Sequence, residues 1–320
     1  MNDIKSTLLK NLGNRRSVFI GILLLVIITV ILFLHPFGTR VNVNVVVSPG
    51  MGAKQIASDL KERGLIQSET LFLILVRLRG AQNSLQAGEY VFKAKTGTFS
   101  ILSKIIKGEV RAIKFTVPEG YTAMQIARLV EEKKFGSAKV FLEKVRERKL
   151  EGYLFPETYM LHRGMDEDDI IRIMRAQFDK VFTQELKKRS LEIGMSEKEV
   201  VTLASIIEKE AKQEEERTLI SSVFHNRLKK GWLLESCATV QYALGEHKKK
   251  LSYDDLRVVS DYNTYLHVGL PPAPICNPGE ASLRAALYPA QSDDLFFVSG
   301  EDGTHRFSRY YKQHLRNKKL

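Results

Sequence analysis

The sequence has few cysteines and prolines. Its 320 residues include two Cys and nine Pro, and this composition excludes collagen-like, mucin-like and wholly disordered chains. Two cysteines cannot build the disulfide framework of a small secreted domain. The seven His residues form neither an HExxH motif nor paired Cys/His spacing, so we expect no metal site. The sequence has no glycine-rich phosphate-binding loop either, and we expect no cofactor.

Acidic residues are also in the minority. The chain has 49 Lys and Arg against 37 Asp and Glu, a formal net charge of +12. Such a charge fits nucleic acid, anionic lipid or another anionic polymer as partner. The last stretch, residues 306–320, holds six Lys and Arg and no acid. A solvated basic tail is a better interpretation of it than a specific anion site.

Only one long apolar run occurs, from Val18 to Leu34, and no charged residue lies between Ser17 and Thr39. As a helix it would be about 26 Å long, close to a hydrocarbon core of about 30 Å. A cleaved signal peptide would have a shorter apolar stretch and a small-residue cleavage site, which His35-Pro36 does not provide. We therefore predict a transmembrane helix over residues 17–38.

Four basic residues and one acid precede this run, so residues 1–16 are expected in the cytoplasm. The remainder of this single-pass inner-membrane protein would then be extracytoplasmic, in the periplasm where there is one. Nucleic acid is not expected there. The remaining anionic partners are lipid headgroups and the cell-wall polymers of a bacterium.

Residues 39–111 read as a small α+β module. The pattern predicts strands near residues 41–47 and 88–92. It also predicts three helices: one with Ile56, Ala57 and Leu60 on one face, one capped by Ser68, and one over residues 98–107 before Gly108. Residues 47–57 and 117–127 are faintly similar at an offset of seventy, and both place a glycine turn between a strand and a helix.

Residues 112–320 read as a second α+β domain, with a mostly helical part at 120–195 and a core at 196–320. Ser196 and Glu199 fit a capping box that starts a helix running to about Lys212. Glu208 lies at the border of its apolar stripe, where partial burial would raise the pKa of a general acid. Glu210 is equally placed on the other border. A surface glutamate paired with Lys212 is the plain alternative.

Several later loops are rich in amides and aromatic residues, the groups that bind sugars by hydrogen bonds and ring stacking. Ordinary turn chemistry explains any one of them as well.

Eight segments together resemble the membrane-anchored endolytic murein transglycosylases, the YceG-like family: LEGYLFPETY (150–159), LASIIEKEA (203–211), VFHNRL (223–228), TVQYALG (239–245), YNTY (262–265), GLPPAPICNPG (269–279), SLRAA (282–286) and FFVSGEDGTHRFS (296–308).

This resemblance implies cleavage of the β-1,4 bond between N-acetylmuramic acid and N-acetylglucosamine inside peptidoglycan glycan strands. The products would carry 1,6-anhydro ends, and cleavage would limit strand growth beside the wall synthases, such as penicillin-binding proteins. It also implies that residues 39–111 are LysM-like and that Glu208 is the catalytic acid. The loop residues then expected to bind substrate are Asn226, Gln241, Asn263, Tyr265 and Asn277.

The chain departs from the family where many relatives have Gln-Ser/Thr-Asp-Pro-Thr and it has Glu235-Ser-Cys237-Ala-Thr239. Cys237 and Cys276 both fall in predicted site loops outside the cytoplasm, so a disulfide between them is possible. Two other functions stay open. A membrane-anchored peptidoglycan-binding protein would need no catalytic carboxyl, whereas a muramidase that hydrolyses the bond would need a second carboxylate, for which Glu157 and Glu235 are the candidates.

Overall fold

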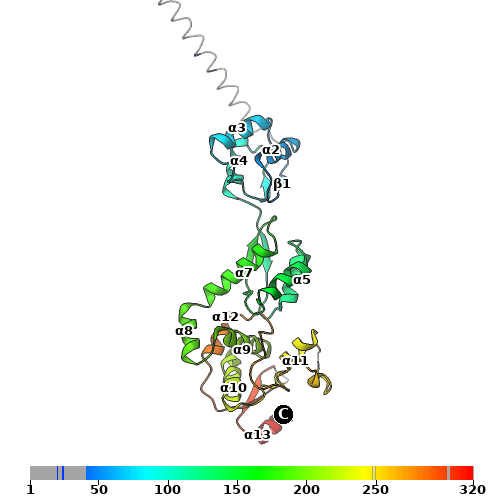
Figure 1. Ribbon diagram of the computed structural model, residues 1–320, viewed down its shortest axis with the longest axis vertical. Helices are drawn as coiled ribbons and strands as arrows, with labels where there is room; N and C mark the ends of the chain where they lie inside the picture. Colours follow the sequence, from blue (N-terminus) through cyan, green and yellow to red (C-terminus); the bar gives the residue numbers. More distant parts are fainter. Residues whose placement is uncertain are drawn as a thin grey trace, which may run out of the picture. The chain divides into compact units, whose positions relative to one another are not determined.

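In this computed structural model, the described residues are 41–246, 248, 250–300 and 303–319, together with Ile20 and Leu24. The chain divides into two compact units. The first ends at Ile113 and includes Leu161–Gly164, and the second comprises Lys114–Met160 and Met165–Leu320 (Figure 1). Both units mix helices with short strands, so the predicted α+β class is confirmed.

The predicted transmembrane helix, residues 17–38, lies outside the described residues apart from Ile20 and Leu24. Within the described ranges, no helix is both long enough and apolar enough to cross a bilayer.

The first unit is built on a two-stranded antiparallel sheet in which Val43 pairs with Phe92 and Val47 with Gly88. Val45 and Val47 are buried, whereas Asn44 and Val46 point outward, as the period of a strand requires. The helices cover one face of the sheet and place their apolar stripes against it. Its elements are β1 (Val43–Val47), α2 (Ala53–Glu62), α3 (Glu69–Leu78), β2 (Gly88–Phe92) and α4 (Thr98–Lys107).

The predicted local signals of this unit are confirmed. Ser68 caps α3 by accepting a hydrogen bond from the Leu71 N–H at 3.3 Å, and Gly108 ends α4 in the left-handed conformation. Ile56 and Leu60 are fully buried on α2.

The two similar segments, 47–57 and 117–127, both lead from the end of a strand through a glycine turn into a helix. Gly50 and Gly120 have positive φ angles of 82° and 73°. The third residue of each helix then caps its own N-terminus. Gln55 accepts a hydrogen bond from the Gly52 N–H at 3.0 Å, and Gln125 accepts one from the Thr122 N–H at 2.8 Å. The similarity therefore reflects shared turn and capping chemistry.

The second unit is mainly helical, with two-stranded sheets β3–β4 and β5–β6. In chain order the remaining elements are β3 (Ile113–Thr116), α5 (Ala123–Glu132), α6 (Ala138–Glu147), β4 (Thr158–Leu161), α7 (Glu167–Val181), α8 (Gln184–Glu192), α9 (Glu197–Glu210), a 3-10 turn (Glu214–Glu216), α10 (Arg217–Lys230), α11 (Cys237–Leu244), a second 3-10 turn (Asp255–Arg257), α12 (Glu280–Leu287), β5 (Phe296–Ser299), β6 (His305–Ser308) and α13 (Tyr311–Asn317).

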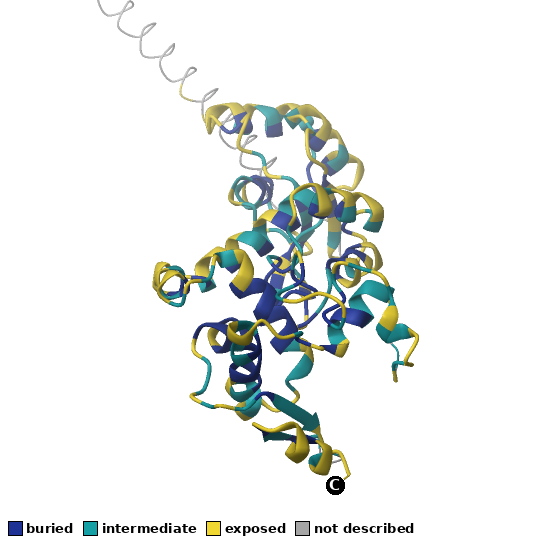
Figure 2. Ribbon diagram, turned by 60° about the horizontal axis from the view of Figure 1, so that its bottom comes forward, coloured by how far each residue is buried: buried dark blue, intermediate teal, exposed yellow. Residues whose placement is uncertain are grey.

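Helix α9 is the centre of this unit. The predicted capping box is present, since the Ser196 hydroxyl accepts a hydrogen bond from the Glu199 N–H and the Glu199 carboxylate accepts one from the Ser196 N–H. Residues 200–207 are all buried because α8, α10, α11 and α12 pack around the helix. Figure 2 shows this packed interior in dark blue and the outer loops mostly in yellow. The helix ends at Glu210 rather than at Lys212, because Ala211 is extended.

Candidate active site

The Glu208 carboxyl lies in the last turn of α9 and is nearly enclosed, with 8% of its side chain exposed. Its Oε2 accepts a hydrogen bond from the Gly279 N–H at 3.1 Å, and its Oε1 lies 3.9 Å from Nη2 of Arg217. Gly279 caps the N-terminus of α12, and Arg217 is the first residue of α10. The N-terminus of α12 and the Arg217 guanidinium therefore both lie beside this carboxyl, and each favours negative charge.

Arg217 is a partly buried cation with a buried side-chain nitrogen that lacks a partner among the described residues. Its side chain is 14% exposed, and its Nε has no hydrogen-bond partner within the described part of the chain. A buried donor without a partner costs free energy, and at a site it marks a place that a ligand can fill.

The segment next to Glu208 is held by Asn277, whose side chain is fully buried. Its Oδ1 accepts a hydrogen bond from the Leu154 N–H at 2.8 Å, and its Nδ2 donates to the Tyr121 carbonyl at 2.9 Å and to Glu151 Oε1 at 3.2 Å. Asn277 thereby joins three segments that lie far apart in sequence.

Glu151 is an enclosed carboxyl that the sequence did not single out. Both of its oxygens accept a hydrogen bond from the Ala123 N–H at the start of α5, at 3.0 and 3.2 Å. The Tyr242 hydroxyl donates to Oε2 at 3.4 Å. Burial raises the pKa of Glu151 to about 7, although these hydrogen bonds oppose the shift.

This carboxyl predicts a pH effect on stability. Between pH 4.5 and 7 the folded chain holds a proton on Glu151 that the unfolded chain releases, so folding stability falls as pH rises through this window. Each unit of pKa shift corresponds to about 1.4 kcal/mol. We expect wild type to lose stability relative to Glu151→Gln between pH 5 and 7.5, measured by urea unfolding of both proteins. Parallel pH profiles would contradict this, because all other groups are common to both.

Glu210, the other predicted candidate, lies on a different side of α9. It accepts a hydrogen bond from the Ser236 hydroxyl at 2.6 Å. Burial raises the pKa of Glu210, and the hydrogen bonds from Ser236 and from the Ala238 backbone oppose the rise. Its bonds to the start of α11 give it a clear packing role.

The predicted sugar-binding residues make hydrogen bonds to different parts of the chain. The Asn226 amide donates to the Ser292 and Asp294 carbonyls at 2.8 and 3.0 Å. The Asn263 amide donates to the Leu256 and Val258 carbonyls at 3.0 and 2.9 Å. The side-chain amides of Asn226, Asn263 and Asn277 therefore all donate hydrogen bonds to backbone carbonyls and stabilise loop conformations.

Gln241 and Tyr265 are both partly exposed. The Gln241 amide donates to the Lys248 carbonyl at 3.3 Å, and the Tyr265 hydroxyl lies 3.2 Å from Cys237 Sγ. These two side chains remain available at the surface beside α11.

The possible Cys237–Cys276 disulfide is not formed, because both cysteines are free thiols. Cys276 is fully buried and donates to the Ser205 carbonyl on α9 at 3.3 Å, whereas Cys237 is exposed beside Tyr265. The fold anchors the two residues to different partners. In the ranges described, no cluster of three His, Cys, Asp or Glu side chains could hold a metal ion.

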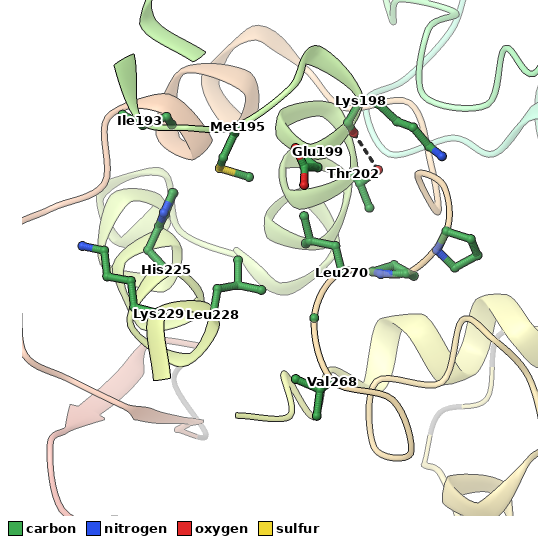
Figure 3. A pocket seen from close by; sticks show the side chains of 13 residues that line it. Ile193, Met195, Lys198, Glu199, Thr202, His225, Leu228, Lys229, Val268 and Leu270 are labelled. Atoms are coloured by element: carbon green, nitrogen blue, oxygen red, sulfur yellow. Dashed lines mark hydrogen bonds between the residues drawn. The ribbon is translucent and has the colours of Figure 1, made fainter. Parts of the chain in front are cut away.

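A cavity of about 640 Å³ lies at the other end of α9 (Figure 3). Lys198, Glu199 and Thr202 of α9 line it, and Glu208 does not. The other walls come from the segment before α9, from α10, and from the loop that leads to Cys276: Ile193, Met195, His225, Leu228, Lys229, Val268, Gly269, Leu270, Pro271 and Pro272.

Comparison with known proteins assigns the family. The model of the YceG-like family matches residues 45–320, and the chain belongs to that family. It is 34% identical over 306 residues to the endolytic murein transglycosylase of Bacillus subtilis (strain 168), covering 86% of this chain and 84% of that protein. It is 28% identical over 321 residues to the endolytic murein transglycosylase of Streptococcus pneumoniae R6, of which it spans 57%.

A solved structure supports the same assignment. The crystal structure of a yceG-like protein from Listeria monocytogenes is 32% identical in sequence and aligns with a TM-score of 0.57. The alignment covers 87% of this chain and 99% of that one.

Proposed function

We propose that this protein is an endolytic peptidoglycan lytic transglycosylase. It cleaves the β-1,4 bond between N-acetylmuramic acid and N-acetylglucosamine within glycan strands and leaves 1,6-anhydro ends. The observation that carries the proposal is the enclosed Glu208 carboxyl, held by the Gly279 N–H in a member of the YceG-like family. Relatives that bear the name endolytic murein transglycosylase support it.

One carboxyl can perform the proton transfers of this reaction. Glu208 gives its proton to the glycosidic oxygen as the bond to the anomeric carbon breaks. The 6-hydroxyl of the same sugar then forms a bond to that carbon and returns its proton to Glu208. Because the attacking group is already attached to the substrate, no water has to be positioned. The Gly279 N–H stabilises the carboxylate between the two steps.

The two alternatives receive less support. The two residues that the sequence offers as the second carboxylate of a hydrolase are engaged elsewhere. Glu157 accepts a hydrogen bond from the Thr158 N–H at 2.8 Å, and Glu235 pairs with Arg227 at 2.9 Å. No contact links either of them to Glu208 in the described part of the chain. A pure binding protein would have no use for an enclosed carboxyl beside an arginine that lacks a full set of partners.

Residues 17–38 would anchor the chain in the cytoplasmic membrane with residues 1–16 inside, so that residues 39–111 and the catalytic domain, 112–320, meet the wall. The strand and helix order of the first unit, β-α-α-β followed by a helix, supports a LysM-like glycan-binding module. Wall synthases at the membrane would be its neighbours, and nascent strands its substrate.

Mass spectrometry of the products tests the proposal. The full chain in detergent is incubated with purified peptidoglycan, and 1,6-anhydro ends are the expected result. Reducing ends would show hydrolysis and overturn it. Retention on peptidoglycan without cleavage would favour the binding protein.

A further inference from the structure

A second carboxyl, that of Glu119, lies beside Glu208. Glu119 belongs to the glycine turn between β3 and α5, which the sequence marked only as one copy of a faint repeat. Its carboxyl packs on the Cα of Gly279 so closely that a Cβ at that position would overlap it. The N–H of the same Gly279 donates to Glu208. One glycine therefore separates the two carboxyl groups.

The turn that carries Glu119 is fixed to the site on both sides. The Gly120 N–H donates to the Asn277 carbonyl, and the Asn277 N–H donates to the Tyr121 carbonyl, both at 2.9 Å. Lys209, the neighbour of Glu208, donates from Nζ to the Gly120 carbonyl at 2.9 Å. A Cβ on Gly120 would lie 3.6 Å from Cγ of Glu208. Glu119 is thus held by backbone contacts at this place.

The electrostatics of Glu119 agree with this placement. Partial loss of hydration raises the pKa of Glu119, and the negative charge of Glu208 raises it further, while Arg217 acts in the opposite direction. Glu119 is nevertheless exposed. It makes no ion pair with any residue that the structure describes. An ordinary surface glutamate would turn away from a second carboxylate toward water or a cation.

We propose that Glu119 is a second catalytic residue whose carboxylate faces the sugar ring at the cleavage point and stabilises the positive charge that develops there. This inference rests on the proposed function. Cleavage of a glycosidic bond passes through an oxocarbenium-like transition state, and a preorganised opposite charge lowers its free energy. Glu119 neither gains nor loses a proton and forms no bond, because Glu208 performs both transfers. The cleaved bond would lie beside Gly279, within reach of both carboxyl groups, with Arg217 beside Glu208.

The test compares the full chain with Glu119→Gln, which keeps the size and removes the charge. On uncrosslinked glycan strands we expect kcat to fall about 10²-fold, with KM within about twofold and Tm unchanged. Glu119→Asp, which keeps the charge on a shorter side chain, should recover part of kcat. Glu157→Gln is the matched control, an exposed glutamate in a neighbouring segment, and should retain wild-type kcat.

The outcomes separate this inference from the function on which it rests. Reducing-end products from wild type would defeat the proposed function itself. Anhydro ends from wild type together with an unchanged kcat for Glu119→Gln would overturn only the role of Glu119. A change confined to KM would make Glu119 a binding residue and would also overturn the inference. A lower Tm, with full kcat for the folded protein at lower temperature, would make it a packing residue and would overturn the inference as well.

Discussion

The Glu208→Gln variant is expected to form 1,6-anhydro ends about 10³-fold more slowly than wild type. Glutamine can still accept the Gly279 N–H, so the local structure should persist. It can neither give a proton to the glycosidic oxygen nor take one from the 6-hydroxyl. The measurement is the initial rate of anhydro-end formation by the full chain, with Tm recorded to show that the variant is folded.

Glu210→Gln is the matched control, because it makes the same chemical change two residues away on the same helix. A glutamine side chain there could still accept the Ser236 hydroxyl that Glu210 accepts now. We expect its rate to stay within a few-fold of wild type. A silent Glu208→Gln and an inactive Glu210→Gln would reassign the acid to Glu210.

The Gly152→Ala variant is expected to lose about 3 kcal/mol of the free energy of unfolding of the second unit. Gly152 has a φ of 88°, which costs an L residue energy, and its Cβ would lie 2.5 Å from two carbons of Pro274 and 2.9 Å from Cγ1 of Val201. Pro274 and Val201 belong to the site loop and to α9, and neither can move freely. Urea unfolding followed by the fluorescence of Trp232, the single tryptophan, reports on this unit.

Gly194→Ala separates strain from packing. Gly194 has a similar φ of 72°, but a Cβ there would meet nothing within 4 Å. This variant should lose only about 1 kcal/mol, the cost of the left-handed backbone. Equal losses in the two variants would mean that the close approach of Gly152 to Pro274 contributes nothing to stability.

The local structure of the chain was predictable because short-range chemistry decides it. Ser196 and Glu199 started α9 as expected, and Ser68 and Gly108 bounded their helices. The end of α9 was misplaced by two residues, since the extended conformation of Ala211 is set by tertiary packing and not by the local pattern. The burial of residues 200–207 on all sides of α9 depends on the helices packed around it, which an amphipathic stripe does not reveal.

The candidate site was only partly predictable. The roles of Asn226, Asn263 and Asn277 as sugar ligands stay predictions, and the structure adds that their amide N–H groups donate to backbone carbonyls. Asn and turns attract such bonds in any protein, so sequence cannot separate the two uses. No local pattern singles out Glu119, Glu151 or Arg217 as site residues. Their importance comes from contacts with residues up to 160 positions away along the chain.

By itself, the sequence determined the class of the fold, the family and the helix that carries Glu208. Each depends on patterns of neighbouring residues or on ordered motifs, which folding does not change. Only the tertiary structure decided what surrounds that carboxyl: the Gly279 N–H, the Arg217 guanidinium and the Glu119 carboxyl. It also kept Cys237 and Cys276 apart as free thiols. These are contacts between segments distant in sequence, and their distances are fixed by the packing of α9, α10 and α12.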